Sequence, residues 1–231
     1  MGVNFNGDNS YIDFGAIVNN QTVRSVSALI CPDDFSNTGA IVYHTGVGWW
    51  IGANIDENLM FVQGFSGTAL LVKTEASTLT AGLWQHVAVT YDGGGDTVNR
   101  PAFYINGASS AGSTAREPSG TIGDDSDGKL HIGGQSVYPT SDPFDGKLQD
   151  VRIYNRILSL AEVQQLYYSK CQNVVLNGLV FWAPLNGAAG MPKFEGATMG
   201  AANYVRDVIS GAIGTPVGNP LGAGNTIQRI R

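Results

Sequence analysis

The sequence predicts an all-β fold in which two antiparallel sheets pack against each other, with one short helix. Three observations favour this class. Glycine is abundant, with 31 residues among 231, while hydrophobic residues make up 43% of the chain and charged residues only 14%. Short apolar runs alternate with glycine-rich turns along most of the sequence, a pattern typical of β-sandwiches. One stretch, at about 159–168, shows helical spacing behind a helix-start signal.

The first part of the chain divides into seven short apolar segments, each expected to form a strand. In the longest of them, the alternation of Val26, Ala28 and Ile30 predicts one buried face, and Pro32 closes the segment. The expected strands are 3–5, 11–14, 23–31, 41–44, 49–53, 59–62 and 69–73.

Further strands are expected in the middle of the chain, at 84–91, 102–105, 130–133 and 147–154. Asn106 and Gly107 favour a tight hairpin turn, because both residue types adopt left-handed backbone conformations readily. Residues 109–127 are polar and are expected to form a long loop, of the kind that is usually functional or flexible.

The expected helix begins with a capping box. Ser159 and Glu162 stand in S-x-x-E spacing, so each side chain can satisfy a free backbone N–H of the first turn. The apolar residues that follow recur at helical spacing. They are Leu160, Val163, Leu166 and Tyr167. A helix with this one apolar face is expected to cover one side of a sheet.

Five motifs, in order, resemble those of laminin G-like, concanavalin A-like jelly-roll domains. Residues 3–15, VNFNGDNSYIDFG, are similar to the opening motif of that family, and residues 144–168, FDGKLQDVRIYNRILSLAEVQQLYY, to its closing motif. Between them lie WQHVAVTYDG at 84–93, FYING at 103–107 and LHIGG at 130–134. The resemblance implies a two-sheet antiparallel jelly-roll β-sandwich. It does not imply one function, because this fold hosts lectins, enzymes, adhesins and structural proteins.

The last part of the chain, 172–231, follows the closing helix and is rich in glycine and alanine. LVFWAPLNGAAG, which begins at residue 179, resembles a phrase that precedes the opening motif in typical members of the family. The resemblance implies a circular permutation, with a core at 1–171 and a tail that supplies a completing strand at about 179–182. That strand could pair within its own chain or be donated to a neighbouring chain. The short link at 169–178 favours the first alternative.

Charge and composition exclude several classes of partner. The net charge is −6 and no run of Lys or Arg occurs, so neither nucleic acid nor an anionic membrane is expected as a partner. No stretch approaches the roughly 20 apolar residues of a membrane span. The first 20 residues lack the basic and apolar regions of a signal peptide. Cys31 and Cys171 are expected as two unpaired thiols, with a single disulfide as the alternative.

The sequence predicts no catalytic site. Glycosidases that resemble this chain often carry alternating carboxylates on one strand, since positions i, i+2 and i+4 share a face and two carboxyl groups must flank the sugar bond. No such triplet occurs, and Asp150 shares its face with Arg152. His44, His86 and His131 have no cysteine or second histidine at ligand spacing. We therefore expect a protein that is not an enzyme.

One structural Ca²⁺ ion is the cofactor that the resemblance implies, near the opening turn and the closing strand. Mapped onto this sequence, its ligands would be Asn6, Asp8 and Asp150. Hard oxygen ligands suit Ca²⁺, which takes six to eight of them. The alternative is that Asp150 pairs with Arg152 or caps backbone N–H groups.

A carbohydrate site is expected around one tryptophan. Trp49 and Trp50 are adjacent, so one should face the core and the other, taken as Trp50, the solvent. Sugar-binding sandwiches stack sugar rings on such aromatics beside polar groups, and Asp92, Asp96 and Tyr138 fall in loops that could assist. The alternative is that both tryptophans serve packing.

The resulting hypothesis is a non-catalytic structural or adhesive protein of a virion surface, such as a phage capsid decoration, cement or fibre protein that binds glycans. Two expectations lead to it: the fold is typical of extracellular proteins, but the sequence shows no export signal. The expected partners are other copies of the chain, a capsid or tail protein, and surface glycans. The first alternative is a calcium-dependent carbohydrate-binding module of an extracellular protein. The second alternative is a glycoside hydrolase-like enzyme.

Overall fold

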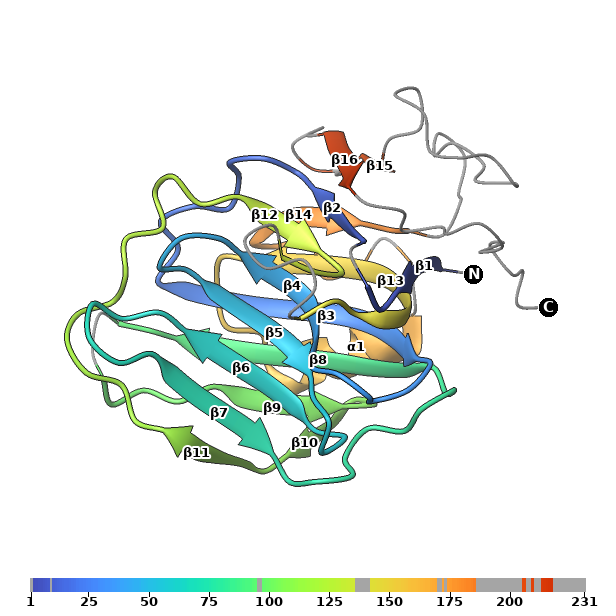
Figure 1. The fold of residues 1–231 in the computed structure, drawn as a ribbon, viewed down its shortest axis with the longest axis horizontal. Helices are drawn as coiled ribbons and strands as arrows, with labels where there is room; N and C mark the ends of the chain where they lie inside the picture. The colour runs from blue at the N-terminus through green and yellow to red at the C-terminus, as the bar shows by residue number, and fades with distance from the viewer. Residues whose placement is uncertain are drawn as a thin grey trace.

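The computed structural model describes residues 2–8, 10–94, 97–135, 142–169, 172, 174–185, 205–206, 209 and 213–217. This part of the chain forms two antiparallel β-sheets, packed face to face, and one helix on the outside of one sheet (Figure 1). The predicted fold class, a two-sheet antiparallel sandwich with one helix, is therefore confirmed.

One sheet has seven strands. In spatial order they are β1 (Val3–Asn6), β13 (Asp145–Tyr154), β3 (Val23–Pro32), β8 (Gln85–Asp92), β9 (Ala102–Ile105) and β10 (Ala108–Ser110), with β14 (Leu179–Ala183) also paired to β13. The long central strands β3 and β13 are buried on both faces over much of their length. The second sheet covers one face, while on the other the helix packs near Tyr154 of β13 and the segment before the helix hydrogen-bonds to Ser25 of β3.

The second sheet has nine strands. In spatial order they are β11 (Gly112–Arg116), β7 (Leu70–Thr74), β6 (Leu59–Gln63), β5 (Trp49–Ala53), β4 (Gly39–His44), β12 (Leu130–Ile132), β2 (Tyr11–Asp13), β16 (Ile213–Val217) and β15 (Val205–Arg206). Its inner face packs on the first sheet and its outer face is covered by no other described element (Figure 1).

The core lies between the two sheets and is rich in aromatic side chains. Among its largest fully buried members are Phe5, Phe61, Phe103, Phe144 and Phe181. Burying one such side chain stabilises the fold by roughly 1.5–3 kcal/mol relative to leaving it in water. Both ends of the described sandwich therefore contribute to the core, since Phe5 lies in β1 and Phe181 in β14.

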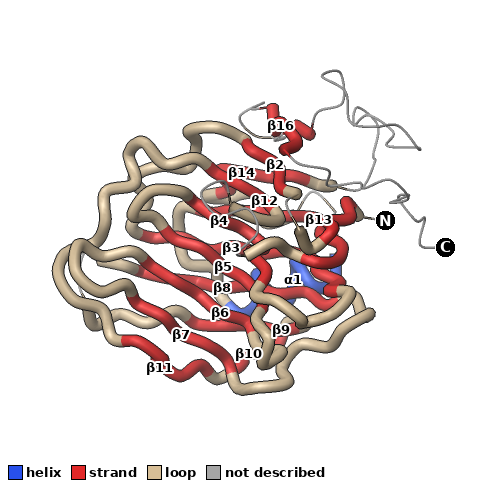
Figure 2. Tube along the Cα trace, viewed as in Figure 1, coloured by secondary structure: helices blue, strands red, loops and turns tan. Residues whose placement is uncertain are grey.

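The predicted helix is present as α1 (Leu160–Ser169), which lies against the seven-stranded sheet (Figure 2). Its capping box forms as expected: a carboxylate oxygen of Glu162 accepts hydrogen bonds from the backbone N–H and the hydroxyl of Ser159, both at 2.9 Å. Arg156 binds the same carboxylate and, with the cap, holds the pKa of Glu162 at about 2. Val163 and Leu166 pack on Tyr154 and its neighbours. In the described part of the chain, no helix is long and apolar enough to cross a membrane.

The predicted loop at 109–127 is wrong in its first half, which contains β10 and β11. The sequence does not predict these strands, because they are edge strands with mostly exposed side chains and show no apolar alternation. Asn106 and Gly107 form the expected hairpin turn between β9 and β10, both with positive φ. The chain then changes sheets at residue 111, since β10 borders one sheet and β11 the other.

Two strands from opposite ends of the chain pair with different parts of β13. β1 pairs with residues 145–148 and β14 pairs with residues 151–154. The expected tail strand at 179–182 is thus found as β14, in the sheet of its own chain. Strand β16 likewise extends the nine-stranded sheet by pairing with β2. The division of the chain near residue 172 stays a prediction.

Asp150 marks the junction between β1 and β14. Its backbone is left-handed, with φ of 54°, at an irregularity of β13, and its N–H donates to the carbonyl of Pro184 at 2.9 Å. Its buried carboxylate accepts hydrogen bonds from Nε of Arg152 at 2.9 Å and from the indole N–H of Trp182 at 2.7 Å. Asp150 therefore fastens β14 to the sheet.

Cys31 is buried in β3 and forms no disulfide, and burial raises the pKa of its thiol. Cys171 lies outside the described residues.

Candidate functional site

A row of rings crosses the outer face of the nine-stranded sheet. It consists of Tyr11 on β2, His131 on β12, Tyr43 on β4 and Trp50 on β5, and we call it the aromatic row. The strand register places His131 opposite Tyr43 and Tyr43 opposite Trp50. Side chains alternate between the two faces of a strand. The neighbours of these four residues along their strands lie mostly in the core, so the four rings lie on the outer face.

The rings contact one another from strand to strand. The ring centroids are 4.8 Å apart for Tyr11 and His131, and 6.4 Å apart both for His131 and Tyr43 and for Tyr43 and Trp50. These separations lie in the range of attractive aromatic pairs. The four rings therefore form one continuous series of contacts, in which Tyr43 and Trp50 are half-buried and Tyr11 and His131 are buried.

Trp50 lies along the sheet, above Gly52. A Cβ atom placed on Gly52 would come within 2.7 Å of Cζ3 of Trp50, so the ring occupies the space that a side chain at this position would fill. Trp50 is half-buried, whereas Trp49 and Ile51 beside it are in the core. A flat, half-exposed indole ring is the geometry on which a sugar ring can stack.

His131 is the fully buried member of the aromatic row. Neither of its ring nitrogens has a hydrogen-bond partner among the described residues. Its Nε2 lies 3.6 Å from a carboxylate oxygen of Asp13, the next residue across the sheet. Burial outweighs this carboxylate and lowers the pKa of His131 to about 4, so the imidazole is neutral at physiological pH.

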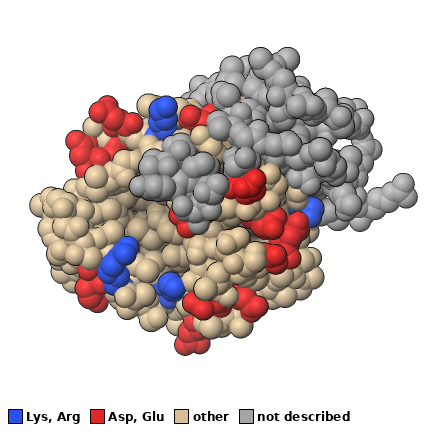
Figure 3. Space-filling model, viewed as in Figure 1, with Lys and Arg blue, Asp and Glu red and all other residues tan. Residues whose placement is uncertain are grey.

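Charged side chains are sparse on the face that Figure 3 shows, and uncharged residues make up most of its visible surface. Such a surface suits a ligand that is recognised by stacking and neutral hydrogen bonds.

The predicted carbohydrate residues do not come together as expected. Trp50 faces outward, as predicted, but Asp92 lies at the end of β8, in the other sheet. There Asp92 is exposed, and its carboxylate accepts a hydrogen bond from the N–H of Gly94 at 3.1 Å, which is a turn-stabilising contact. Asp96 and Tyr138 lie outside the described residues.

The structure also separates the predicted calcium ligands. Asn6 is paired with Asp145, so Asp150 lies five residues further along β13, roughly 15 Å away at the rise of a strand. The side-chain oxygen of Asn6 already accepts hydrogen bonds from Ser10 and from the N–H of Asp8. Because Ca²⁺ ligands must lie 2.3–2.6 Å from one ion, these three residues do not fit one site. No group of three His, Cys, Asp or Glu side chains that could hold a metal ion occurs among the described residues.

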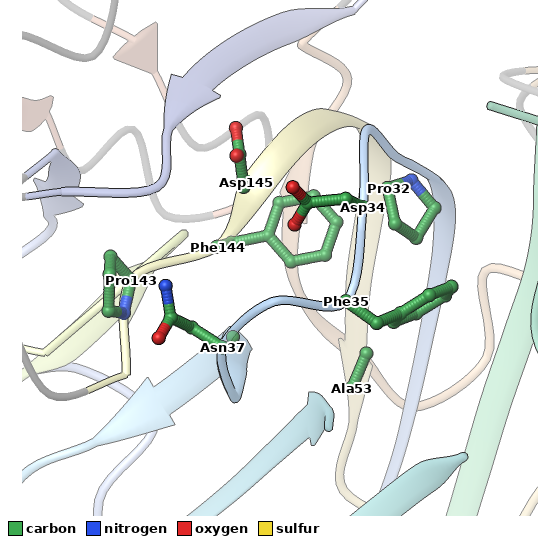
Figure 4. Close-up of a pocket in the computed structure, with 9 residues that line it drawn as sticks. Pro32, Asp34, Phe35, Asn37, Ala53, Pro143, Phe144 and Asp145 are labelled. Atoms are coloured by element: carbon green, nitrogen blue, oxygen red, sulfur yellow. The ribbon is translucent and has the colours of Figure 1, made fainter. Parts of the chain in front are cut away.

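Near the opening turn, a small hollow lies where β3 ends and β13 begins. Figure 4 shows Phe144 between Pro143 and the segment from Pro32 to Phe35, with the carboxylates of Asp34 and Asp145 nearby. Burial, and then Asp34 and Asp33, raise the pKa of Asp145. The hollow encloses only about 10 Å³, room for at most one water molecule, so it is not a ligand site of useful size.

Comparison with protein families gives one match, which covers most of the sandwich. Residues 6–164 match Laminin_G_3, described as the concanavalin A-like lectin/glucanases superfamily. A search of curated protein sequences found no match.

Solved structures of similar fold come from diverse sources. A proposed carbohydrate-binding protein from Bacteroides ovatus has a TM-score of 0.59 and 22% identity, and the match covers 94% of this chain and 59% of that one. A CBM40 domain of a Ruminococcus gnavus sialidase has a TM-score of 0.53 and 12% identity over 72% of this chain and 96% of that one. Tailspike protein 2 of an Escherichia coli O157:H7 bacteriophage has a TM-score of 0.51 and 13% identity over 78% of this chain and 25% of that one. At these identities the similarity concerns the fold.

Proposed function

The chain belongs to the concanavalin A-like lectin/glucanases superfamily, and from this premise we propose that it is a non-catalytic protein that binds carbohydrate on the outer face of its nine-stranded sheet. The observation that carries this proposal is the aromatic row, with the half-buried indole of Trp50 extending over Gly52.

The row matches the chemistry of a sugar chain. The apolar face of a sugar ring can stack on Trp50, while the phenol groups of Tyr43 and Tyr11 and the carboxylate of Asp13 offer polar partners at the same surface. From β2 to β5 there are three strand spacings, about 14 Å in all. This length exceeds one sugar ring, so an oligosaccharide is the proposed ligand.

A glycan array followed by titration calorimetry tests the proposal. Trp50→Ala should weaken binding of the selected oligosaccharide at least about tenfold, because the ring supplies both apolar area and stacking. The control is Tyr168→Ala, which removes an exposed aromatic side chain from α1, on the other sheet. Equal affinities of the two variants would refute the proposed site. Chelation of calcium should leave binding unchanged, since the predicted calcium ligands are far apart.

The absence of catalysis is part of the proposal. Glycosidases need two carboxyl groups about 5–10 Å apart on either side of the sugar bond. Asp13 is the carboxylate that pairs with the described aromatic row, and its neighbour across the sheet is His131. We expect no release of reducing ends from any oligosaccharide bound on the array. Release that is lost in Asp13→Asn would contradict this part of the proposal.

A virion setting is a second proposal, supported by the occurrence of a similar fold in a bacteriophage tailspike protein. It requires partners among particle proteins or other copies of the chain. If it is correct, antibodies against the protein should label purified particles, and light scattering should show the assembly. A protein that is found only apart from particles would contradict it.

A further inference from the structure

A second hollow opens at the rim of the sandwich, away from the aromatic row. It encloses about 130 Å³, between the loops at 20–22 and 122–125. Its mouth is formed by exposed residues, including Asn20 and Asp124, while Arg24 of β3 and Gln63 of β6 lie buried at its base. A single water needs only about 10–15 Å³, so the hollow has room for a ligand group of several atoms. We call it the rim cavity.

Arg24 is a buried cation that no described carboxylate contacts directly, although the charge of Asp125 acts on it from a longer distance. Only 3% of its surface is exposed. Its guanidinium donates to the side-chain oxygen of Gln63 and to the backbone carbonyl of Gln21, and lies 4.8 Å from the centre of the Trp49 ring. These partners are neutral. In the described part of the chain no carboxylate lies within 4.0 Å of the guanidinium, and Nε has no hydrogen-bond partner.

An unpaired buried charge lowers stability, and structures therefore usually supply a partner. Burial lowers the pKa of Arg24 to about 10, so it still carries its charge at physiological pH. The side-chain oxygen of Gln21, which also lines the cavity, is buried and has no donor. The cavity thus combines a cation whose Nε–H lacks an acceptor with a side-chain oxygen that lacks a donor.

The two carboxylates of the cavity already have partners. Asp125 accepts a hydrogen bond from the N–H of Asn20 at 2.7 Å and lies 3.8 Å from Nδ1 of His44. Asp124 is exposed, and its carboxylate accepts a hydrogen bond from the N–H of Ser126 at 2.9 Å. Their negative charge disfavours phosphate or sulfate, which carry two charges, and favours a ligand with one negative charge and several hydroxyl donors.

We propose that the rim cavity binds an acidic monosaccharide unit, with the sugar carboxylate accepting hydrogen bonds from Arg24 and a sugar hydroxyl donating to the side-chain oxygen of Gln21. This inference adds a second, acid-specific site to the proposed carbohydrate-binding function. It is carried by Arg24 and does not depend on the aromatic row.

The test on the unmodified chain uses matched probes. Glucuronate, N-acetylneuraminate, glucose and lactate are titrated separately, with the Arg24 Nε–H signal followed by NMR. At least one of the two sugar acids should shift this signal and bind about tenfold or more tightly than glucose or lactate, since hydrogen bonds between charged groups are the stronger ones. Glucose or lactate binding as tightly as both acids, or no binding of either acid at millimolar concentration, would overturn the proposal.

Variants separate this site from the aromatic row. Arg24→Met should lower the affinity for the sugar acid about tenfold or more, whereas Trp50→Ala should leave it unchanged. Because Arg24→Met can also disturb folding, Asp124→Asn is the second variant: this exposed change removes a negative charge and should raise the affinity for the acid but not for glucose. An unchanged acid affinity in Asp124→Asn, or its loss in Trp50→Ala, would refute the rim site. The failure of neutral glycans to bind would refute only the aromatic row.

Discussion

Asp150→Asn should be one of the most damaging single changes in the protein, although it alters only one charge. Asp150 is 5% exposed and Arg152 is 1% exposed, and the pair is joined at 2.9 Å inside the sheet. Asparagine keeps the size of the side chain, tolerates the positive φ of this position and can still accept the hydrogen bond from Trp182. The substitution therefore isolates the loss of charge.

The expected cost is about 3–5 kcal/mol, because removing one partner of a buried ion pair leaves the other charge uncompensated. The guanidinium of Arg152 keeps its hydrogen bonds to the carbonyls of Val174 and Gln172, but these do not neutralise it. Such a loss is a large part of the roughly 5–15 kcal/mol that stabilises a typical domain.

Equilibrium unfolding in denaturant measures this cost. The control is Asp56→Asn, since Asp56 lies 3.6 Å from Lys73 at the surface, where an ion pair contributes about 1 kcal/mol or less. A cost for Asp150→Asn no greater than that of the control would show that Asp150 does not fasten β14 to the sheet.

Three further predictions concern stability. Gly133→Ala should lower the free energy of unfolding by several kcal/mol, because the new Cβ would lie 2.1 Å from the ring of Phe5. Gly15→Ala is the control: Gly15 has a similar positive φ but nothing within 4 Å, so the change should cost only about 1–2 kcal/mol. Equal thermal shifts of the two variants would contradict this prediction. The pKa of His131 in the folded chain is about 4, below the ordinary 6.5, so the unfolded chain binds the proton at a higher pH than the folded chain does. The free energy of unfolding should therefore fall as the pH drops from 6.5 to 4, by up to about 1.4 kcal/mol per pH unit. His131→Gln should flatten that slope, and an unchanged slope would refute the assignment. Deleting residues 172–231 removes β14 and should lower heat stability or solubility; a truncated chain that is monomeric and equally heat-stable would show that the tail does not complete the sheet.

The strands and the helix could be predicted because their signals are local. Val26, Ala28 and Ile30 alternate as a strand with one buried face should, and the Ser159–Glu162 cap marks the helix start within one residue. Strands β10 and β11 could not be predicted, because their exposed side chains at the sheet edges leave no apolar pattern.

The candidate site could be predicted only in part. Trp50 was identifiable as an outward residue from its place beside Trp49. Tyr43 and His131 belong to the same surface only through the strand register, which the sequence does not state. A signal was nevertheless present, because Tyr43 follows the core residue Val42 and His131 stands between the core residues Leu130 and Ile132 in predicted strands. The separation of Asn6 from Asp150 likewise depends on register, since it is Asp145 that pairs with Asn6.

The most direct test of carbohydrate binding at the aromatic row is an NMR titration that follows the indole N–H signals of the tryptophans. On addition of an oligosaccharide selected on the array, the signal of Trp50 should shift, while those of Trp49 and Trp182, which are buried, should stay in place. Saturable binding that leaves the Trp50 signal unmoved would contradict the account.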